Sequence, residues 1–276
     1  MIDQMIITYC ICDEVVKTFN IKDDIQCKMS TAEIMTFAIT SAILYGGNYR
    51  ITRVMATNHS YFPKILSHSQ LVRRIHQIPE PVWHMTFIAL QMLLKSDVNK
   101  SFIVDSFPVK AYENHKSFRA KIFAEKKYHG YTASKKQYFF GIKVNMIINS
   151  DGVPIEFSFS PGNSSDISEL QSLSVSLPRN SILLGDAAYT HYKFEDDLRK
   201  NMGIKLLAKR RKNLKRQNSK DEKLLLSTQR NYIETVFSSI VSRMPRYIKA
   251  RTEKGFCLKV LFFILAYMVN LYFPLR

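Results

Sequence analysis

Two aspartates follow apolar segments at positions where a fold could bring them together. Asp105 comes directly after the apolar residues 102–104, and Asp186 comes directly after the apolar residues 182–185. A carboxylate on a buried strand is costly unless a hydrogen-bond partner or a metal ion compensates it. Two such carboxylates on neighbouring strands repel each other, and divalent cations are the usual remedy. The pair therefore indicates a cation site.

A third acid, Glu234, lies beside an apolar stripe with helical spacing. The stripe contains Ile233, Val236, Phe237, Ile240, Val241 and Met244. A helix packed on the sheet could hold Glu234 over the strand ends, although a simple surface pair with Arg230 at i−4 is an alternative. With the two aspartates, Glu234 would complete the hard oxygen ligands of a phosphoryl-transfer site with two Mg²⁺ or Mn²⁺ ions.

The pattern of residues 98–276 predicts the elements that must position these acids. The expected strands are 101–107, 137–149, 153–160, 181–185 and 204–208, and the expected helices are 166–177, 191–201 and 228–244. A turn at 150–152 joins two of the strands into a hairpin. The order predicts an α/β fold with a mixed sheet and flanking helices. Asp166, with Glu169 three residues later, is interpreted as a helix N-cap rather than a catalytic acid.

Residues 1–97 read as a small all-helical domain, separated from domain 98–276 only by the change in periodicity. Ser30 and Glu33 form a capping box. In residues 66–78, Leu71, Ile75 and Ile78 share one face while polar and basic residues lie elsewhere. This arrangement suits a DNA recognition helix that uses Arg73 and Arg74, or equally an ordinary surface helix.

The composition favours a polyanionic partner. The chain has 276 residues, and 40 Lys and Arg against 23 Asp and Glu give a formal charge of +17. This charge indicates nucleic acid or an anionic membrane, and the composition excludes a collagen-like repeat and a disulfide-rich secreted module. The four cysteines lack zinc-site spacing and predict reduced thiols in a cytosol. The apolar residues 260–269 are too few to span a bilayer and predict a buried core helix.

Basic residues are concentrated in two regions that we expect to contact DNA. Residues 199–223 hold 11 Lys or Arg against two acids, and should border the metal site unless they form only a solvated loop. Residues 110–136 mix lysines with aromatic residues that could stack on bases. The DNA-binding candidates are Arg73, Arg74, Lys126, Lys127, Lys135, Lys136, Lys209, Arg210, Arg211, Lys212, Lys215, Arg216 and Arg230.

Six short segments carry a family resemblance through their order and spacing. They are residues 103–109, 130–136, 140–143, 161–163, 186–189 and 230–238. Together they resemble the DDE transposases of bacterial insertion sequences, and most closely the insertion-sequence 982 family. The chain departs from the pattern at Ala188, where Gly is expected. Ser227 and Val241 replace a Tyr and a Lys that often flank the Arg-x-x-x-Glu unit. Of the basic and aromatic residues of this pattern, only Arg230 therefore carries over.

The resemblance implies an RNase H-like catalytic core in which Asp105, Asp186 and Glu234 bind two Mg²⁺ ions. Such enzymes cut DNA at the ends of the element and join the 3′-OH ends to target DNA. We therefore expect double-stranded DNA as partner, a homo-oligomer on DNA, no membrane, and a nucleoid-associated protein of the bacterial cytoplasm. Two alternatives are a catalytically inactive DNA-binding protein derived from a transposase and a nuclease of the same fold. A membrane-associated basic protein is a third.

Overall fold

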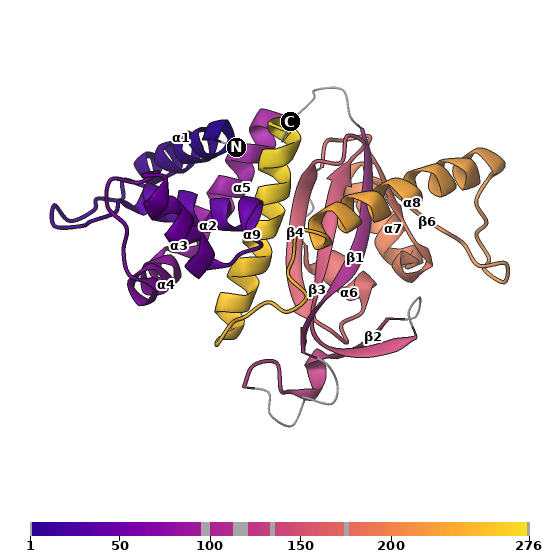
Figure 1. Cartoon of the computed structure of the whole chain (residues 1–276). Coiled ribbons are helices and arrows are strands. Elements are labelled where there is room, and N and C mark those ends of the chain that lie inside the picture. The colour runs from indigo at the N-terminus through magenta and orange to yellow at the C-terminus, as the bar shows by residue number, and fades with distance from the viewer. Residues whose placement is uncertain (1, 95–99, 113–120, 133–135, 174–176, 275–276) are drawn as a thin grey trace. The chain divides into compact units, whose positions relative to one another are not determined.

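The chain folds into two compact units. The computed structural model describes residues 2–94, 100–112, 121–132, 136–173 and 177–274, except for the side chain of Arg230 (Figure 1). The helical unit comprises Met1–Lys95 and Ser239–Arg276, and the sheet unit comprises Ser96–Ser238. The C-terminal segment therefore joins the helical unit, whereas the sequence analysis assigned it to the second domain.

The helical unit is built around two helices that are apolar on nearly all sides. Its helices are α1 (Ile2–Thr18), α2 (Thr31–Leu44), α3 (Tyr49–Asn58), α4 (His68–Gln77), α5 (Glu80–Leu94) and α9 (Glu253–Tyr272). α2 and α9 are largely buried, as expected for helices without a polar face. The ring of Trp83 on α5 lies 4.7 Å from that of Phe262 on α9. These contacts explain why α9 belongs to this unit.

α9 is the one described helix that is long and apolar enough to cross a membrane. In the folded chain, 72% of its apolar window is buried inside the protein. The core helix expected over residues 260–269 is therefore present, and it is longer than the sequence pattern indicated. The capping box of Ser30 and Glu33 at the start of α2 is also confirmed.

The sheet unit contains one mixed sheet. Its strands are β1 (Ser101–Tyr112), β2 (His129–Thr132), β3 (Gln137–Asn149), β4 (Pro154–Pro161), β5 (Ile182–Gly185) and β6 (Lys205–Ala208). The order is β2-β3-β1-β5-β6, and β4 also pairs with β3. β5 is parallel to β1 and β6, whereas β3 is antiparallel to its partners. This confirms the predicted mixed sheet and hairpin and is compatible with an RNase H-like fold.

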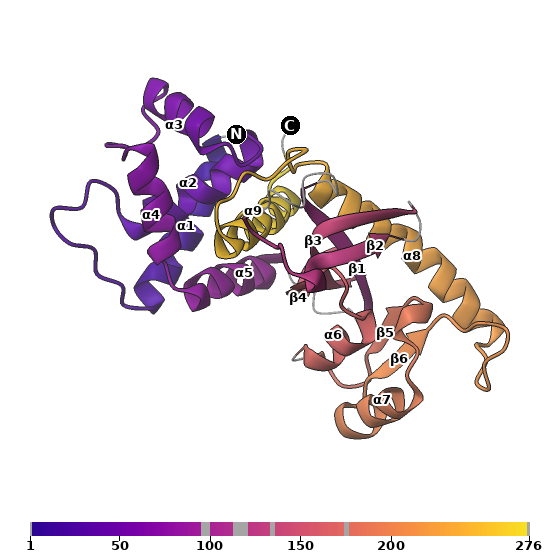
Figure 2. The same cartoon turned by 90° about the horizontal axis from the view of Figure 1, so that it is seen from below.

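Helices cover both faces of this sheet (Figure 2). They are α6 (Asp166–Ser172), α7 (Tyr192–Asp197) with the π-helical turn Leu198–Met202, and α8 (Lys220–Val241); short 3₁₀ turns span Lys126–Tyr128 and Ala187–Tyr189. Phe102 and Val104 of β1 pack with Leu170 of α6. On the opposite face, the ring of Phe107 lies 4.7 Å from that of Phe237 on α8. Alternate residues of β1 thus face different helices.

Three glycines pack closely where β2, β3 and β4 meet. A Cβ at Gly130 would lie 2.3 Å from the carbonyl oxygen of Gly162, and one at Gly141 would lie 2.2 Å from that of Val109. Gly162 N–H also donates to the Gly141 carbonyl at 3.1 Å. Any larger residue would push the strands apart. This explains in physical terms why glycine stands in three of the six motif segments.

Candidate active site

Asp105 lies on β1, and Asp186 directly follows β5, the strand next to β1. Ile103 of β1 pairs with Leu184 of β5 in parallel register, so the residues two positions further along are the two aspartates. Adjacent strands are about 4.8 Å apart. Asp105 Oδ1 accepts a hydrogen bond from Ser106 N–H at 2.8 Å, and Asp186 Oδ1 accepts one from Ala188 N–H at 2.7 Å. These bonds orient both carboxylates, and the expectation that the strands lie side by side is confirmed.

The side chain of Asp105 faces α8. Asp105 alternates with Phe107, whose ring contacts Phe237, and both residues therefore point to the same face of β1. Glu234 lies three residues before Phe237, about one turn along α8. It is exposed, while Ile233 beside it is buried. The helix that carries Glu234 thus covers the face toward which Asp105 points.

A small cavity of about 30 Å³ opens beside both aspartates. Its wall is formed by Ile103, Val104, Asp105, Leu184, Gly185, Asp186, Lys209, Leu226 and Ile233. Pockets for small-molecule substrates are usually several hundred Å³. The cavity is therefore too small for such a substrate, and hydrophobic residues form most of its wall. Lys209, whose backbone N–H donates to the Gly185 carbonyl at 3.1 Å, forms part of this wall.

The donor chemistry fits a hard divalent cation, although the described side chains do not form a closed cluster. Carboxylate oxygens are the ligands that Mg²⁺ and Mn²⁺ prefer. Among the residues that the structure describes, no group of three or more His, Cys, Asp and Glu side chains lies close enough together to hold a metal ion. Asp105 and Asp186 supply two carboxylates at one cavity. That Glu234 binds the same metal ions as a third ligand stays a prediction.

Asp166 lies near the two aspartates, which the sequence analysis did not expect. It is the first residue of α6, and Ser165 is the N-cap, so the interpretation of Asp166 as the N-cap was wrong. Its Oδ1 accepts a hydrogen bond from Ser106 Oγ at 2.7 Å and forms an ion pair with Lys143 Nζ at 3.2 Å. A cation already compensates this carboxylate. Asp186 differs, because its Oδ1 accepts a hydrogen bond from the backbone amide of Ala188.

Tyr189 connects the three aspartates electrostatically. Burial raises the pKa of its phenol well above the ordinary value, and the negative charges of Asp105, Asp166 and Asp186 raise the pKa further. Its ring also packs against Gly185, where a Cβ would lie only 2.9 Å from a ring carbon. The tyrosine therefore stays protonated and fills the space beneath the turn that carries Asp186.

Comparison with known families agrees with this arrangement. A family model described as "Transposase DDE domain" matches residues 95–246, more than half of the chain. The chain belongs to the DDE transposase family. No curated protein gives a match. The family membership implies a metal-dependent enzyme that binds and cleaves DNA. The matched range contains both aspartates, Glu234 and the basic stretch after β6.

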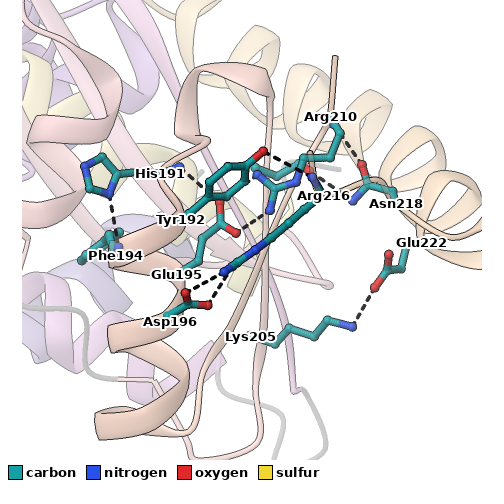
Figure 3. A network of polar contacts seen from close by, with 11 residues as sticks. His191, Tyr192, Phe194, Glu195, Asp196, Lys205, Arg210, Arg216, Asn218 and Glu222 are labelled. Carbon is teal, nitrogen blue, oxygen red and sulfur yellow. Dashed lines mark hydrogen bonds and ion pairs between the residues drawn. The ribbon is translucent and has the colours of Figure 1, made fainter. Parts of the chain in front are cut away.

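Two arginines of the basic stretch of this transposase domain form ion pairs with acids of α7 (Figure 3). Arg210 forms a bidentate ion pair with Glu195 of α7, and the two side chains are only 6% and 7% exposed. Arg216 forms two 2.8 Å bonds with Asp196, which lower the pKa of that carboxyl. Both guanidinium groups also lie over the ring of Tyr192, at 5.3 and 4.8 Å.

These pairs change the expected role of the stretch. The buried Arg210 fixes the loop to α7, which favours a structural role, and its predicted contact with DNA stays a prediction. Asn218 holds the loop from inside, since its side-chain oxygen accepts from Arg210 N–H and its amide donates to the Ala208 carbonyl. Besides the paired Arg216, which is itself half exposed, the loop carries four exposed cations: Lys209, Arg211, Lys212 and Lys215. The transposase domain thus presents a folded basic loop next to the cavity.

The other DNA-binding candidates have different surroundings. Arg73 is exposed on α4, whereas Arg74 forms a 2.9 Å ion pair with Asp23 and contacts the Cys27 sulfur. Arg74 therefore anchors α4 to the segment before α2, which favours a structural role. Lys126, Lys127 and Lys136 are exposed, and Lys127 pairs with Glu125 at 2.9 Å. Lys135 and the side chain of Arg230 lie outside the described residues.

Several residues of the site were not identified from the sequence. Lys143 and Tyr189 end the motif segments 140–143 and 186–189, but their roles depend on strand pairing and on packing under Gly185. Glu195 appeared as one of several acids on an expected helix. Its partner lies 15 residues away, and only the contact between α7 and the loop reveals the pair.

Proposed function

We propose that this protein is an insertion-sequence transposase of the 982 type. It would cleave DNA at the ends of its element in a Mg²⁺-dependent reaction and transfer the 3′-OH ends to target DNA. Asp105, Asp186 and Glu234 would hold two Mg²⁺ or Mn²⁺ ions. When bound, such ions activate the attacking oxygen and stabilise the leaving oxygen of an in-line displacement.

The chain's own residues would orient the substrate around this site. The backbone amides of Ser106 and Ala188 hold the two aspartates in place through the bonds described above. Lys209 lines the same cavity as the two aspartates, and its cation would contact a phosphate next to the bond that is cut. The exposed cations Arg211, Lys212 and Lys215 would bind phosphates further along without reading sequence.

One observation carries this proposal most strongly: Asp105 on β1 and Asp186 directly after the adjacent parallel strand β5 border one cavity, and Lys209 forms part of its wall. A solvated aspartate at the end of a strand would not require a second aspartate and a lysine around the same cavity. The register of β1 and β5 therefore supports a catalytic reading over a structural one. The exposed Arg73 on α4 supports a further role of the helical unit in recognising the element's ends.

A cleavage and joining assay with the DNA that flanks the gene tests the proposal. We expect wild-type protein with Mg²⁺ to nick the end DNA and to produce joined target products. Asp105→Asn, Asp186→Asn and Glu234→Gln should each abolish both reactions and preserve DNA binding, because the basic loop is unchanged. Cleavage without joined products would indicate the nuclease, and binding without cleavage would indicate the inactive DNA-binding protein.

A further inference from the structure

One end of the sheet carries a row of five neighbouring aromatic rings, which we call the aromatic ladder. It consists of Tyr112 of β1, His129 and Tyr131 of β2, and Tyr138 and Phe140 of β3. Strand register places His129 opposite Phe140 and Tyr131 opposite Tyr138, and Tyr112 is also paired with Phe140. The five side chains therefore project from the same face of three adjacent strands.

The rings follow one another at stacking distance. Their centroid separations are 5.2 Å for Tyr112 and Phe140, 4.6 Å for Phe140 and His129, 5.1 Å for His129 and Tyr138, and 4.8 Å for Tyr138 and Tyr131. The first three pairs are close to parallel, with interplanar angles of 19°, 17° and 29°. The row thus presents aromatic rings in succession toward its outer end.

The outer end of the ladder is open to solvent. Tyr131 and Tyr138 are 50% and 57% exposed, although aromatic side chains normally contribute large buried areas. The core is formed by the opposite face of the same strands, where Phe139 is buried and Gly130 packs against Gly162. Folding therefore does not require these two tyrosines on the surface.

Positive charge surrounds the ladder. Lys110 of β1 is exposed and donates to Gln137 Oε1 at 3.1 Å, directly before Tyr138. Lys136 is exposed at the start of β3, and Lys126 is exposed just before β2. Among the described residues between 121 and 138, Glu125 is the single acid. Lysine is depleted in protein–protein interfaces, so lysines around exposed aromatic rings favour a nucleic-acid partner.

We propose that the aromatic ladder is a stacking platform for an unpaired DNA base, with Lys110 and Lys136 at the neighbouring phosphates. The inference rests on the proposed function, because cut DNA ends supply unpaired bases. Every base has a π-face, so the platform tolerates any sequence. Tyr112 lies seven positions after Asp105 on β1, which is about 23 Å at the rise of a strand. The stacked base is therefore several nucleotides from the bond that is cut.

Fluorescent DNA binding by the full-length protein without divalent metal tests this platform. The probe is a duplex with a short single-stranded overhang that contains 2-aminopurine, and the comparison is the blunt duplex of the same sequence. We expect wild-type protein to prefer the overhang and to quench 2-aminopurine. Tyr131→Ala with Tyr138→Ala should weaken overhang binding by roughly five-fold or more, remove the quenching, and leave blunt-duplex affinity unchanged.

The matched control is Tyr131→Phe with Tyr138→Phe, which keeps both rings and should behave as wild type. Equal wild-type affinity for overhang and blunt DNA would overturn the platform and leave the proposed cleavage standing. An equal loss for both DNAs in the Ala variant would also overturn it, as would a loss of self-association, which would reveal a protein interface. Wild-type protein that binds neither DNA would contradict the proposed function itself.

Discussion

The buried ion pair between Arg210 and Glu195 gives a sharp test of how the basic loop is built. Arg210→Ala would leave the Glu195 carboxylate buried without its cation. Removal of one partner from such a pair costs about 3–5 kcal/mol of unfolding free energy. With a urea dependence of about 2 kcal/mol per molar, the unfolding midpoint should fall by roughly 1.5–2.5 M. The loop should also be held less tightly to α7, because only the contacts of Arg216 with Asp196 and Tyr192 remain of those described above.

Lys212→Ala is the matched control, since Lys212 is exposed on the same loop. It should change stability by less than about 0.5 kcal/mol. Its effect should instead appear in DNA binding, where the log–log salt slope should shrink by roughly 0.9 for the lost phosphate contact. The double variant Arg210→Met with Glu195→Gln removes both charges and should recover most of the lost stability.

Urea titrations followed by circular dichroism, together with DNA titrations between low and moderate salt, separate the two effects. The reasoning is refuted if Arg210→Ala unfolds at the same urea concentration as Lys212→Ala. It is also refuted if Arg210→Ala, while fully folded, reduces the salt slope as Lys212→Ala does. Either result would indicate that Arg210 binds a DNA phosphate instead of holding the loop on α7.

Three further predictions concern the helical unit. Arg73→Ala should cost about 1–3 kcal/mol of affinity for the element's end DNA if Arg73 contacts a base edge. Arg74→Ala should instead lower the unfolding free energy by about 1 kcal/mol. Equal effects of the two changes on DNA affinity would contradict this difference. Iodoacetamide at pH 8 should modify the exposed Cys10 and spare Cys12 in native protein, because burial raises the pKa of the Cys12 thiol to about 12 and keeps it protonated; peptide mass spectrometry would disprove this by finding Cys12 alkylated first. A fragment of residues 1–95 should fail to fold because it lacks α9, and a cooperative thermal transition of that fragment would show the opposite.

The juxtaposition of the aspartates could be predicted because local sequence specifies it. Asp105 and Asp186 each follow an apolar run, and β-strands of that kind pair within one sheet. The hairpin of β3 and β4 could also be predicted, because the turn residues 150–152 end in a glycine. The structure shows why glycine suits this position, since Gly152 has a φ of +78°. In these cases the signal lies within a few residues, and the tertiary structure follows the same pattern.

Other features depend on contacts between distant segments. Charge density predicts exposed cations over the basic stretch, and only the contact with α7 shows that the Arg210 side chain is buried. The ion pair of Arg74 could not be predicted for the same reason, because its partner Asp23 is 51 residues away. β2 is four residues long and was missed, since so short a strand gives no clear alternation. α9 was assigned by continuity along the chain, although its apolar surface packs with the N-terminal helices.

Metal binding by the full-length protein on end DNA tests most directly whether Glu234 completes the site. Mn²⁺ affinity can be measured by electron paramagnetic resonance for wild type, Asp105→Asn, Asp186→Asn, Glu234→Gln and, as the neighbouring control, Asp166→Asn. We expect the first three variants to weaken Mn²⁺ binding by at least about ten-fold, and Asp166→Asn to stay near wild type because Lys143 already compensates that carboxylate. Unchanged affinity in Glu234→Gln together with a loss in Asp166→Asn would contradict the assignment and make Asp166 the third acid.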